Sequence, residues 1–176
     1  MNTTERNKLV REIKEAILKV PETAESGDRA WTKEIKLRLE RLAEKHDCDT
    51  CPNSKNGNKG WLYDQTWFTK SEKGRLKSVP FVMESEWRNN MEYIKYDFEK
   101  LLLANSPIKL MVFQSTASKP EEMQNRFREM ESGINDYKYD NSGIYILACY
   151  VLKNGRHMFD IRIFEKKLGK KARPID

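Results

Sequence analysis

The stretch Val79–Gln114, VPFVMESEWRNNMEYIKYDFEKLLLANSPIKLMVFQ, decides the fold because its hydrophobic period changes twice. Val79–Trp87 and Ile108–Gln114 are apolar runs of strand length. Between them, Met91–Ala104 carries its apolar residues at helical spacing. The order strand, helix, strand predicts one unit of an α/β domain.

The flanking segments extend this pattern in both directions. Upstream, we predict a helix over residues 4–20, capped by Thr3 or Thr4, then a second helix, a loop over residues 46–60 and a strand at Trp61–Phe68. Downstream, we predict a helix from Pro120 to about Gly133, a buried strand over residues 143–152 and an edge strand over residues 157–164. The predicted fold class is therefore α/β, with a mixed central β-sheet flanked by helices.

Length and composition limit the classes of protein to consider. A chain of 176 residues predicts a single domain over residues 1–176, with an N-terminal helix at 4–20 and a basic tail at 166–176. The net charge of +6 is compatible with a polyanionic partner such as nucleic acid. The longest uncharged apolar run, residues 143–152, is too short for a bilayer, and the N-terminus has no apolar signal core. We therefore expect a cytoplasmic protein without a membrane partner.

Acidic residues within the apolar strands are the most unusual feature. Asp64 lies within WLYDQTWF, and Glu84 and Glu86 end the run VPFVMESEW. Buried acids are costly unless they are paired or bound to a metal. Since side chains alternate along a strand, Glu84 and Glu86 share one face, roughly 7 Å apart. Converging carboxylates would suit Mg²⁺, whereas the alternative is a strand end where these acids meet solvent or Arg88.

The placement of these acids resembles that in the restriction-endonuclease-like, PD-(D/E)XK nuclease superfamily. An acid in one strand is followed by an acid-x-acid pair in the next strand and then by a helix. The superfamily core is a mixed sheet flanked by helices in the order α-β-β-β-α-β. Four segments in series resemble a bacterial family within it: WTKEIK (31–36), WLYDQTW (61–67), VPFVMESEW (79–87) and YDFEKLLLA (96–104).

The resemblance implies a role for each matched residue. Asp64 and Glu84 take the places of the two motif acids that hold Mg²⁺ or Mn²⁺. Glu86 stands where the superfamily usually has its lysine, and it would serve as a further ligand or orient the attacking water. Lys100, on the following helix, is the candidate for the displaced lysine. Glu34 matches an acid that some members add to the metal site. The implied activity is hydrolysis of nucleic-acid phosphodiesters, with DNA as the expected partner and a homodimer as one possible assembly.

Two other hypotheses remain open from the sequence. A degenerate member of the superfamily would be a module that binds DNA or a protein without catalysis. A zinc-dependent interaction domain would use His46, Cys48 and Cys51, although a structural zinc needs four ligands. Under the nuclease hypothesis, three basic clusters would follow backbone phosphates. They are Lys55–Lys59, Lys70–Lys77 and Lys166–Arg173.

Overall fold

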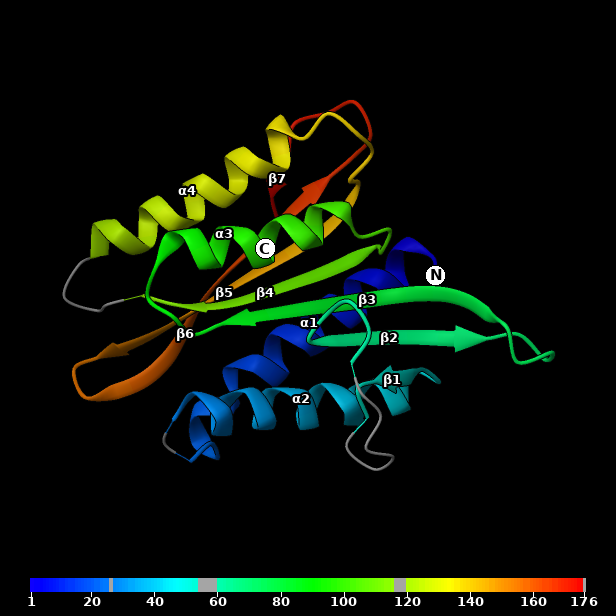
Figure 1. Cartoon of the computed structure of the whole chain (residues 1–176), viewed down its shortest axis with the longest axis horizontal. Coiled ribbons are helices and arrows are strands. Elements are labelled where there is room, and N and C mark those ends of the chain that lie inside the picture. Colours follow the sequence, from blue (N-terminus) through cyan, green and yellow to red (C-terminus); the bar gives the residue numbers. More distant parts are fainter. Residues whose placement is uncertain (26, 54–59, 116–119, 176) are drawn as a thin grey trace. The chain divides into compact units, whose positions relative to one another are not determined.

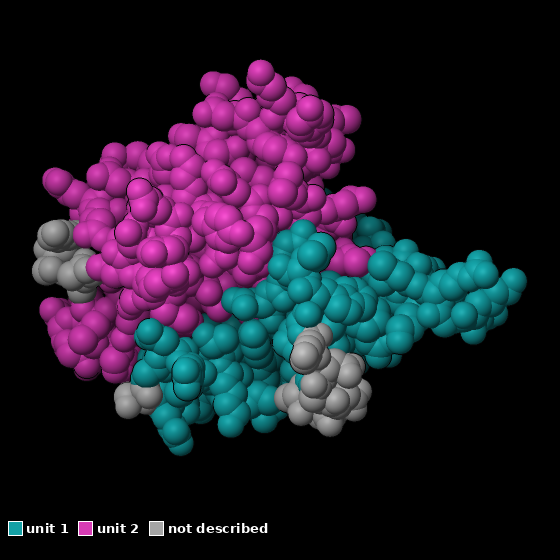
Figure 2. Space-filling model, viewed as in Figure 1, with its two compact units in different colours: residues 1–78 teal, residues 79–176 magenta. Residues whose placement is uncertain are grey.

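The structure is a computed structural model that describes residues 1–25, 27–53, 60–115 and 120–175. The chain divides into two compact units, unit 1 (Met1–Ser78) and unit 2 (Val79–Asp176), which Figure 2 distinguishes by colour. The basic cluster predicted at Lys55–Lys59 lies outside the described residues. The single domain predicted over residues 1–176 stays a prediction.

Unit 1 begins with two helices, α1 (Thr3–Leu18) and α2 (Asp28–Lys45), joined through a short 3-10 helix, η1 (Val20–Glu22). The N-cap of α1 is Asn2, and not Thr3 or Thr4 as predicted. Asn2 and Glu5 form a capping box, in which each side chain accepts a hydrogen bond from the other residue's backbone N–H at 2.9 Å. This reciprocal pair satisfies two backbone donors of the first turn, which explains why the helix starts one residue early.

The strands of unit 1 differ from the prediction in position. A short strand, β1 (Asp49–Cys51), lies within the segment predicted as a loop and pairs antiparallel with β2 (Gln65–Lys70). The predicted strand at 61–68 is thus displaced toward the C-terminus, and Asp64 precedes β2 instead of lying inside it. The ring of Trp61 stacks on that of Phe68 with centroids 4.8 Å apart, so Trp61 folds back onto the strand.

Unit 2 contains a mixed sheet built around β3 (Leu76–Glu86), which starts at the end of unit 1. β3, β4 (Ile108–Gln114) and β5 (Gly143–Lys153) run parallel, whereas β6 (Arg156–Lys166) and β7 (Arg173–Pro174) continue the sheet antiparallel. Helices α3 (Met91–Leu103) and α4 (Pro120–Asp136) connect the parallel strands. The predicted α/β class with a mixed sheet and flanking helices is confirmed.

Both helices of unit 2 pack on the same face of its sheet (Figure 1). Phe98 of α3 contacts Tyr145 of β5 at a centroid distance of 6.3 Å, and Phe127 of α4 contacts Phe113 of β4 at 5.4 Å. Gly133 of α4 faces α3, where a Cβ would lie in ordinary van der Waals contact with the ring of Phe98, at 3.4 Å. In the described parts of the chain, no helix combines the length and apolar character needed to cross a bilayer.

Candidate active site

The strand β3 points Glu84 and Glu86 toward the face that α3 and α4 cover. In the parallel pairing with β4, Glu84 lies opposite Met111 and Glu86 lies opposite Phe113. The ring of Phe113 contacts Phe127 of α4, so the two acids share the face that the helices cover. Glu84 is only 2% exposed, so an unpaired charge there would be costly. Its Oε1 atom lies 2.7 Å from Nζ of Lys100 on α3. The structure therefore brings together two of the predicted site residues.

Asp97 is a third member of this cluster, and sequence reasoning did not assign it a role. Lys100 Nζ donates a hydrogen bond to Asp97 Oδ1 at 3.1 Å, because residues three apart lie on one side of a helix. The D-x-x-K spacing next to the two acids of β3 was the signal that could have identified it. Two carboxylates thus share one ammonium, which leaves this Glu84–Lys100–Asp97 cluster with a negative surplus.

Burial by itself would lower the pKa of Lys100, but its contacts with carboxylates decide the outcome. Hydrogen bonds to Glu84 and Asp97, together with the attraction of both charges, raise the pKa above the ordinary lysine value. Lys100 is therefore a fixed cation at neutral pH. Such a group can stabilise negative charge but cannot act as a general base.

Glu86 is engaged by a different cation, Arg88. Glu86 Oε1 accepts hydrogen bonds from the backbone N–H of Arg88 at 2.7 Å and from its Nε at 3.0 Å, and Oε2 accepts from the same guanidinium. Burial raises the pKa of Glu86, but these bonds outweigh it and lower the pKa overall. The guanidinium also lies over the ring of Tyr93, 3.5 Å from its centroid. The contact with Arg88 is the one that the alternative interpretation of these acids expected.

The remaining predicted acids, Asp64 and Glu34, belong to unit 1. The side chain of Asp64 is 33% exposed and lies 3.7 Å from Nζ of Lys36. Glu34 Oε1 accepts hydrogen bonds from Thr23 Oγ1 and Arg38 Nε, each at 2.7 Å. Burial raises the pKa of Glu34, but the two donors lower it overall. Residues two apart on a helix do not face each other, so Glu34 and Lys36 point in different directions from α2.

The candidate zinc ligands of unit 1 have other partners. His46 Nε2 lies 2.5 Å from Glu12 Oε2, and Lys45 contacts the other oxygen of the same carboxylate. Burial, reinforced by Asp47 and Asp49, raises the pKa of the Cys48 thiol. The free side chain of Cys48 is therefore a thiol at neutral pH, whereas zinc binds the thiolate. The described geometry thus gives the His46, Cys48 and Cys51 hypothesis no support.

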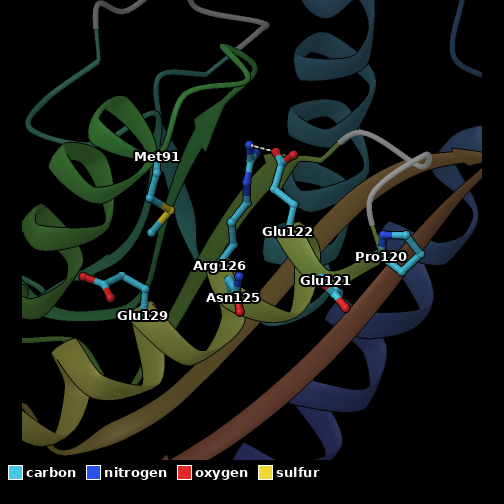
Figure 3. Close-up of a pocket in the computed structure, with 7 residues that line it drawn as sticks. All are labelled: Met91, Pro120, Glu121, Glu122, Asn125, Arg126 and Glu129. Atoms are coloured by element: carbon cyan, nitrogen blue, oxygen red, sulfur yellow. Dashed lines mark hydrogen bonds and ion pairs between the residues drawn. The ribbon is translucent and has the colours of Figure 1, made fainter.

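A hollow of about 930 Å³ lies at the N-terminus of α4, close to Met91 at the start of α3. Its wall contains Glu121, Glu122 and Glu129 and one buried cation, Arg126. Arg126 donates hydrogen bonds to the backbone carbonyl of Gln114 and to the carboxylate of Glu122. Figure 3 shows the side chains of Arg126 and Glu122 meeting. Because the acids outnumber Arg126, the wall is better suited to a cation or polar group than to a phosphate.

The donor chemistry around Glu84 fits a hard divalent cation. Among the described side chains, no three His, Cys, Asp or Glu residues are grouped so as to hold a metal ion. Mg²⁺, however, usually takes one or two protein carboxylates and completes its shell with water and substrate phosphate. Glu84 and Asp97 supply two such carboxylates, and a metal ion there would have to share them with the ammonium group of Lys100. Metal binding at Glu86 would first have to break its pair with Arg88.

Comparison of the chain with models of protein families, with curated proteins and with solved structures gave no match.

Proposed function

We propose that the chain is a divalent-metal-dependent nuclease in which Glu84 is a metal ligand and Lys100 stabilises the transition state. The contact that carries this proposal is the 2.7 Å distance between Lys100 Nζ and Glu84 Oε1. It brings a lysine from α3 to the second motif acid, in line with members of the superfamily whose lysine has moved to the following helix. The element order α2, β1, β2, β3, α3, β4 also agrees with the core that this resemblance implies.

Each residue of the cluster has a distinct part in this proposal. A bound Mg²⁺ or Mn²⁺ would activate water and neutralise charge on the scissile phosphate. Lys100, protonated at neutral pH, would stabilise the negative charge that develops on the phosphoryl oxygens. Asp97 is a positioning residue, since it holds the ammonium group from the same helix. Asp64 remains the predicted second ligand on the basis of the sequence resemblance.

The pairing of Glu86 with Arg88 favours a second candidate function, a nuclease-like module that binds without cutting. In that case the acids of β3 would serve only to anchor cations, and the protein would bind nucleic acid without needing a metal. Calorimetry with Mn²⁺ separates the two candidates. The nuclease gives a binding isotherm that Glu84→Gln abolishes, whereas the binding module gives no isotherm in either protein.

Cleavage of plasmid DNA and of a single-stranded oligonucleotide, in Mg²⁺ or Mn²⁺, tests the proposal directly. We expect Lys100→Met and Glu84→Gln to reduce the cleavage rate by about 100-fold or more, the typical loss for removal of a transition-state charge partner. Lys95→Met is the matched control, because Lys95 lies on the same helix with its side chain 53% exposed. Circular dichroism confirms folding at the assay temperature. Wild-type cleavage by folded Lys100→Met would refute the assigned role.

A further inference from the structure

A second hollow, of about 390 Å³, lies in unit 2 between two connections of the sheet. One wall is the α4–β5 connection, residues 137–142, and the other is the last residue of β6 with the β6–β7 connection, residues 166–172. Four lysines line it, and we call it the lysine hollow. They are Lys138, Lys166, Lys170 and Lys171.

The charge of the lysine hollow is not balanced by acids. Within the described part of the chain, none of its four lysines has an ion-pair partner. The single acid of the lining, Asp140, accepts a hydrogen bond from the backbone N–H of Ser142 at 2.9 Å. The neighbouring Glu165 is already shared by Lys167 at 3.5 Å and Arg173 at 2.8 Å. The hollow is therefore a site of positive potential that attracts anions.

An exposed aromatic ring lies among these lysines. Tyr139 is 77% exposed, and its ring lies 5.8 Å from that of Tyr137, which also lines the hollow. An aromatic face beside backbone-binding cations is the combination that single-stranded nucleic acid uses, because bases stack on rings while phosphates contact lysines. The bases of a double helix are already stacked and are not available to Tyr139. The carboxylates of an acidic peptide would pair with the lysines but would not stack on the ring.

The walls of the hollow are fixed by hydrogen bonds. Asn135 Oδ1 accepts from the backbone N–H of Ala172 at 2.7 Å, which ties the end of α4 to the β6–β7 connection. Lys109 Nζ donates to the carbonyls of Asn141 at 3.1 Å and Ser142 at 3.4 Å. This buried lysine therefore fixes the α4–β5 connection, which is the other wall. A preformed site loses little conformational entropy when a ligand binds.

We propose that the lysine hollow binds single-stranded nucleic acid, with phosphates on Lys170 and Lys171 and one base stacked on Tyr139. This site is separate from the Glu84–Lys100–Asp97 cluster. It lies where β5 begins and β6 ends, whereas Glu84 is near the end of β3, which runs parallel to β5 through β4. The inference extends the proposed function but does not depend on it, because strand binding here requires neither a metal nor cleavage.

Fluorescence anisotropy of the full chain with a labelled twelve-nucleotide oligo-dT, in EDTA, tests this proposal. We expect Lys170→Ala/Lys171→Ala to weaken binding about 10-fold at low salt and to reduce the salt slope by about 1.4, since each lost phosphate contact removes roughly 0.7. Tyr139→Ala should weaken binding about 10-fold, and Tyr139→Phe should restore it, because stacking needs only the ring.

Matched variants and competitors decide between this site and a general charge effect. Lys8→Ala/Lys19→Ala removes the same charge from exposed positions of unit 1 that lie outside the basic clusters, and it should change affinity less than about twofold. If the two double variants behave alike, or if Tyr139→Ala binds like wild type, the proposal is wrong. Equal competition by duplex DNA, polyglutamate or phosphatidylserine vesicles would also refute it. Glu84→Gln should bind oligo-dT as tightly as the wild type does, whether or not the wild type cuts DNA. The binding assay therefore tests the lysine hollow, and the cleavage assay tests the nuclease proposal independently.

Discussion

Lys100 and Lys109 of unit 2 are both held by oxygen atoms, yet the chemistry of those oxygens differs. Lys100 contacts two carboxylates, and those contacts raise its pKa. Lys109 is 1% exposed, and the oxygens that hold it belong to two backbone carbonyls and the hydroxyl of Tyr145, at 3.0 Å. Burial lowers the pKa of Lys109 to about 8, against a smaller opposing effect from Asp140.

The difference shows that burial alone does not make a lysine a candidate for chemistry. At Lys100, the charge is paired with two carboxylates, and the side chain is 33% exposed. At Lys109, the charge fixes a loop and has no access to a ligand. A perturbed pKa is thus a weaker guide to function than the chemical identity of the contacting atoms.

Substitution of Lys100 should have the largest effect on stability. Lys100→Met leaves Glu84 buried without its ammonium partner, and loss of one member of a buried pair costs about 3–5 kcal/mol. Because Lys100 is a third exposed, we expect about 2–3 kcal/mol in the free energy of unfolding. Urea denaturation at pH 7 measures it.

A double variant sharpens this prediction. Glu84→Met/Lys100→Met removes both charges and should recover most of the loss, since apolar side chains tolerate the same burial. A double variant no more stable than Lys100→Met would mean that packing, and not charge pairing, governs this position.

A smaller and pH-dependent effect is expected at Lys109. Lys109→Met removes a buried ammonium that has no carboxylate partner. We expect the free energy of unfolding to fall by about 1 kcal/mol at pH 7, which is the net value of the lost hydrogen bonds. The folded pKa of about 8 lies below the ordinary lysine value of 10.5. Between these values the unfolded chain binds more protons, so the stability of wild type relative to Lys109→Met should rise with pH.

Denaturation of both proteins at pH 7, 8, 9 and 10 checks the sign of this effect. Groups that titrate in both proteins cancel in the difference between them. A wild-type advantage that falls over this range would show that the carbonyl contacts stabilise the ammonium enough to overcome its burial.

The sequence predicted the bounds of α3 and β4 in unit 2 better than those of β1 and β2 in unit 1. The strand Ile108–Gln114 is found with the predicted bounds, and α3 begins at Met91 as predicted. Both segments have apolar side chains that end in the core, so the pattern records the burial. Trp61 and Leu62 are 52% and 78% exposed, and their apolar character wrongly extended the predicted strand upstream of β2. Strands as short as β1 are below the length at which periodicity can be read.

The candidate site was only partly accessible to sequence reasoning. The alternation of β3 correctly placed Glu84 and Glu86 on one face, and Lys100 was identified as a candidate from its helix. Which cation each acid selects depends on side-chain conformation, and Arg88 folds back onto Glu86 from two residues away. Hydrophobic periodicity predicts which face of a strand or helix a side chain occupies, but it does not predict the ion-pair partner. The role of Asp97 was missed for this reason.

Substitution of Lys95 should have the smallest effect and isolates the contribution of the carboxylate partner. Lys95 pairs with Glu129 of α4 at 3.4 Å, and both side chains are 53% exposed. Exposed pairs of this kind contribute about 0–1 kcal/mol because water and salt screen them. We expect Lys95→Met to change the free energy of unfolding by less than about 0.5 kcal/mol. Lys95 and Lys100 differ by five positions on one helix, so helix propensity and the Lys→Met change are matched. A loss at Lys95 as large as that at Lys100 would mean that the variants report on α3 as a whole and not on the buried Glu84 pair.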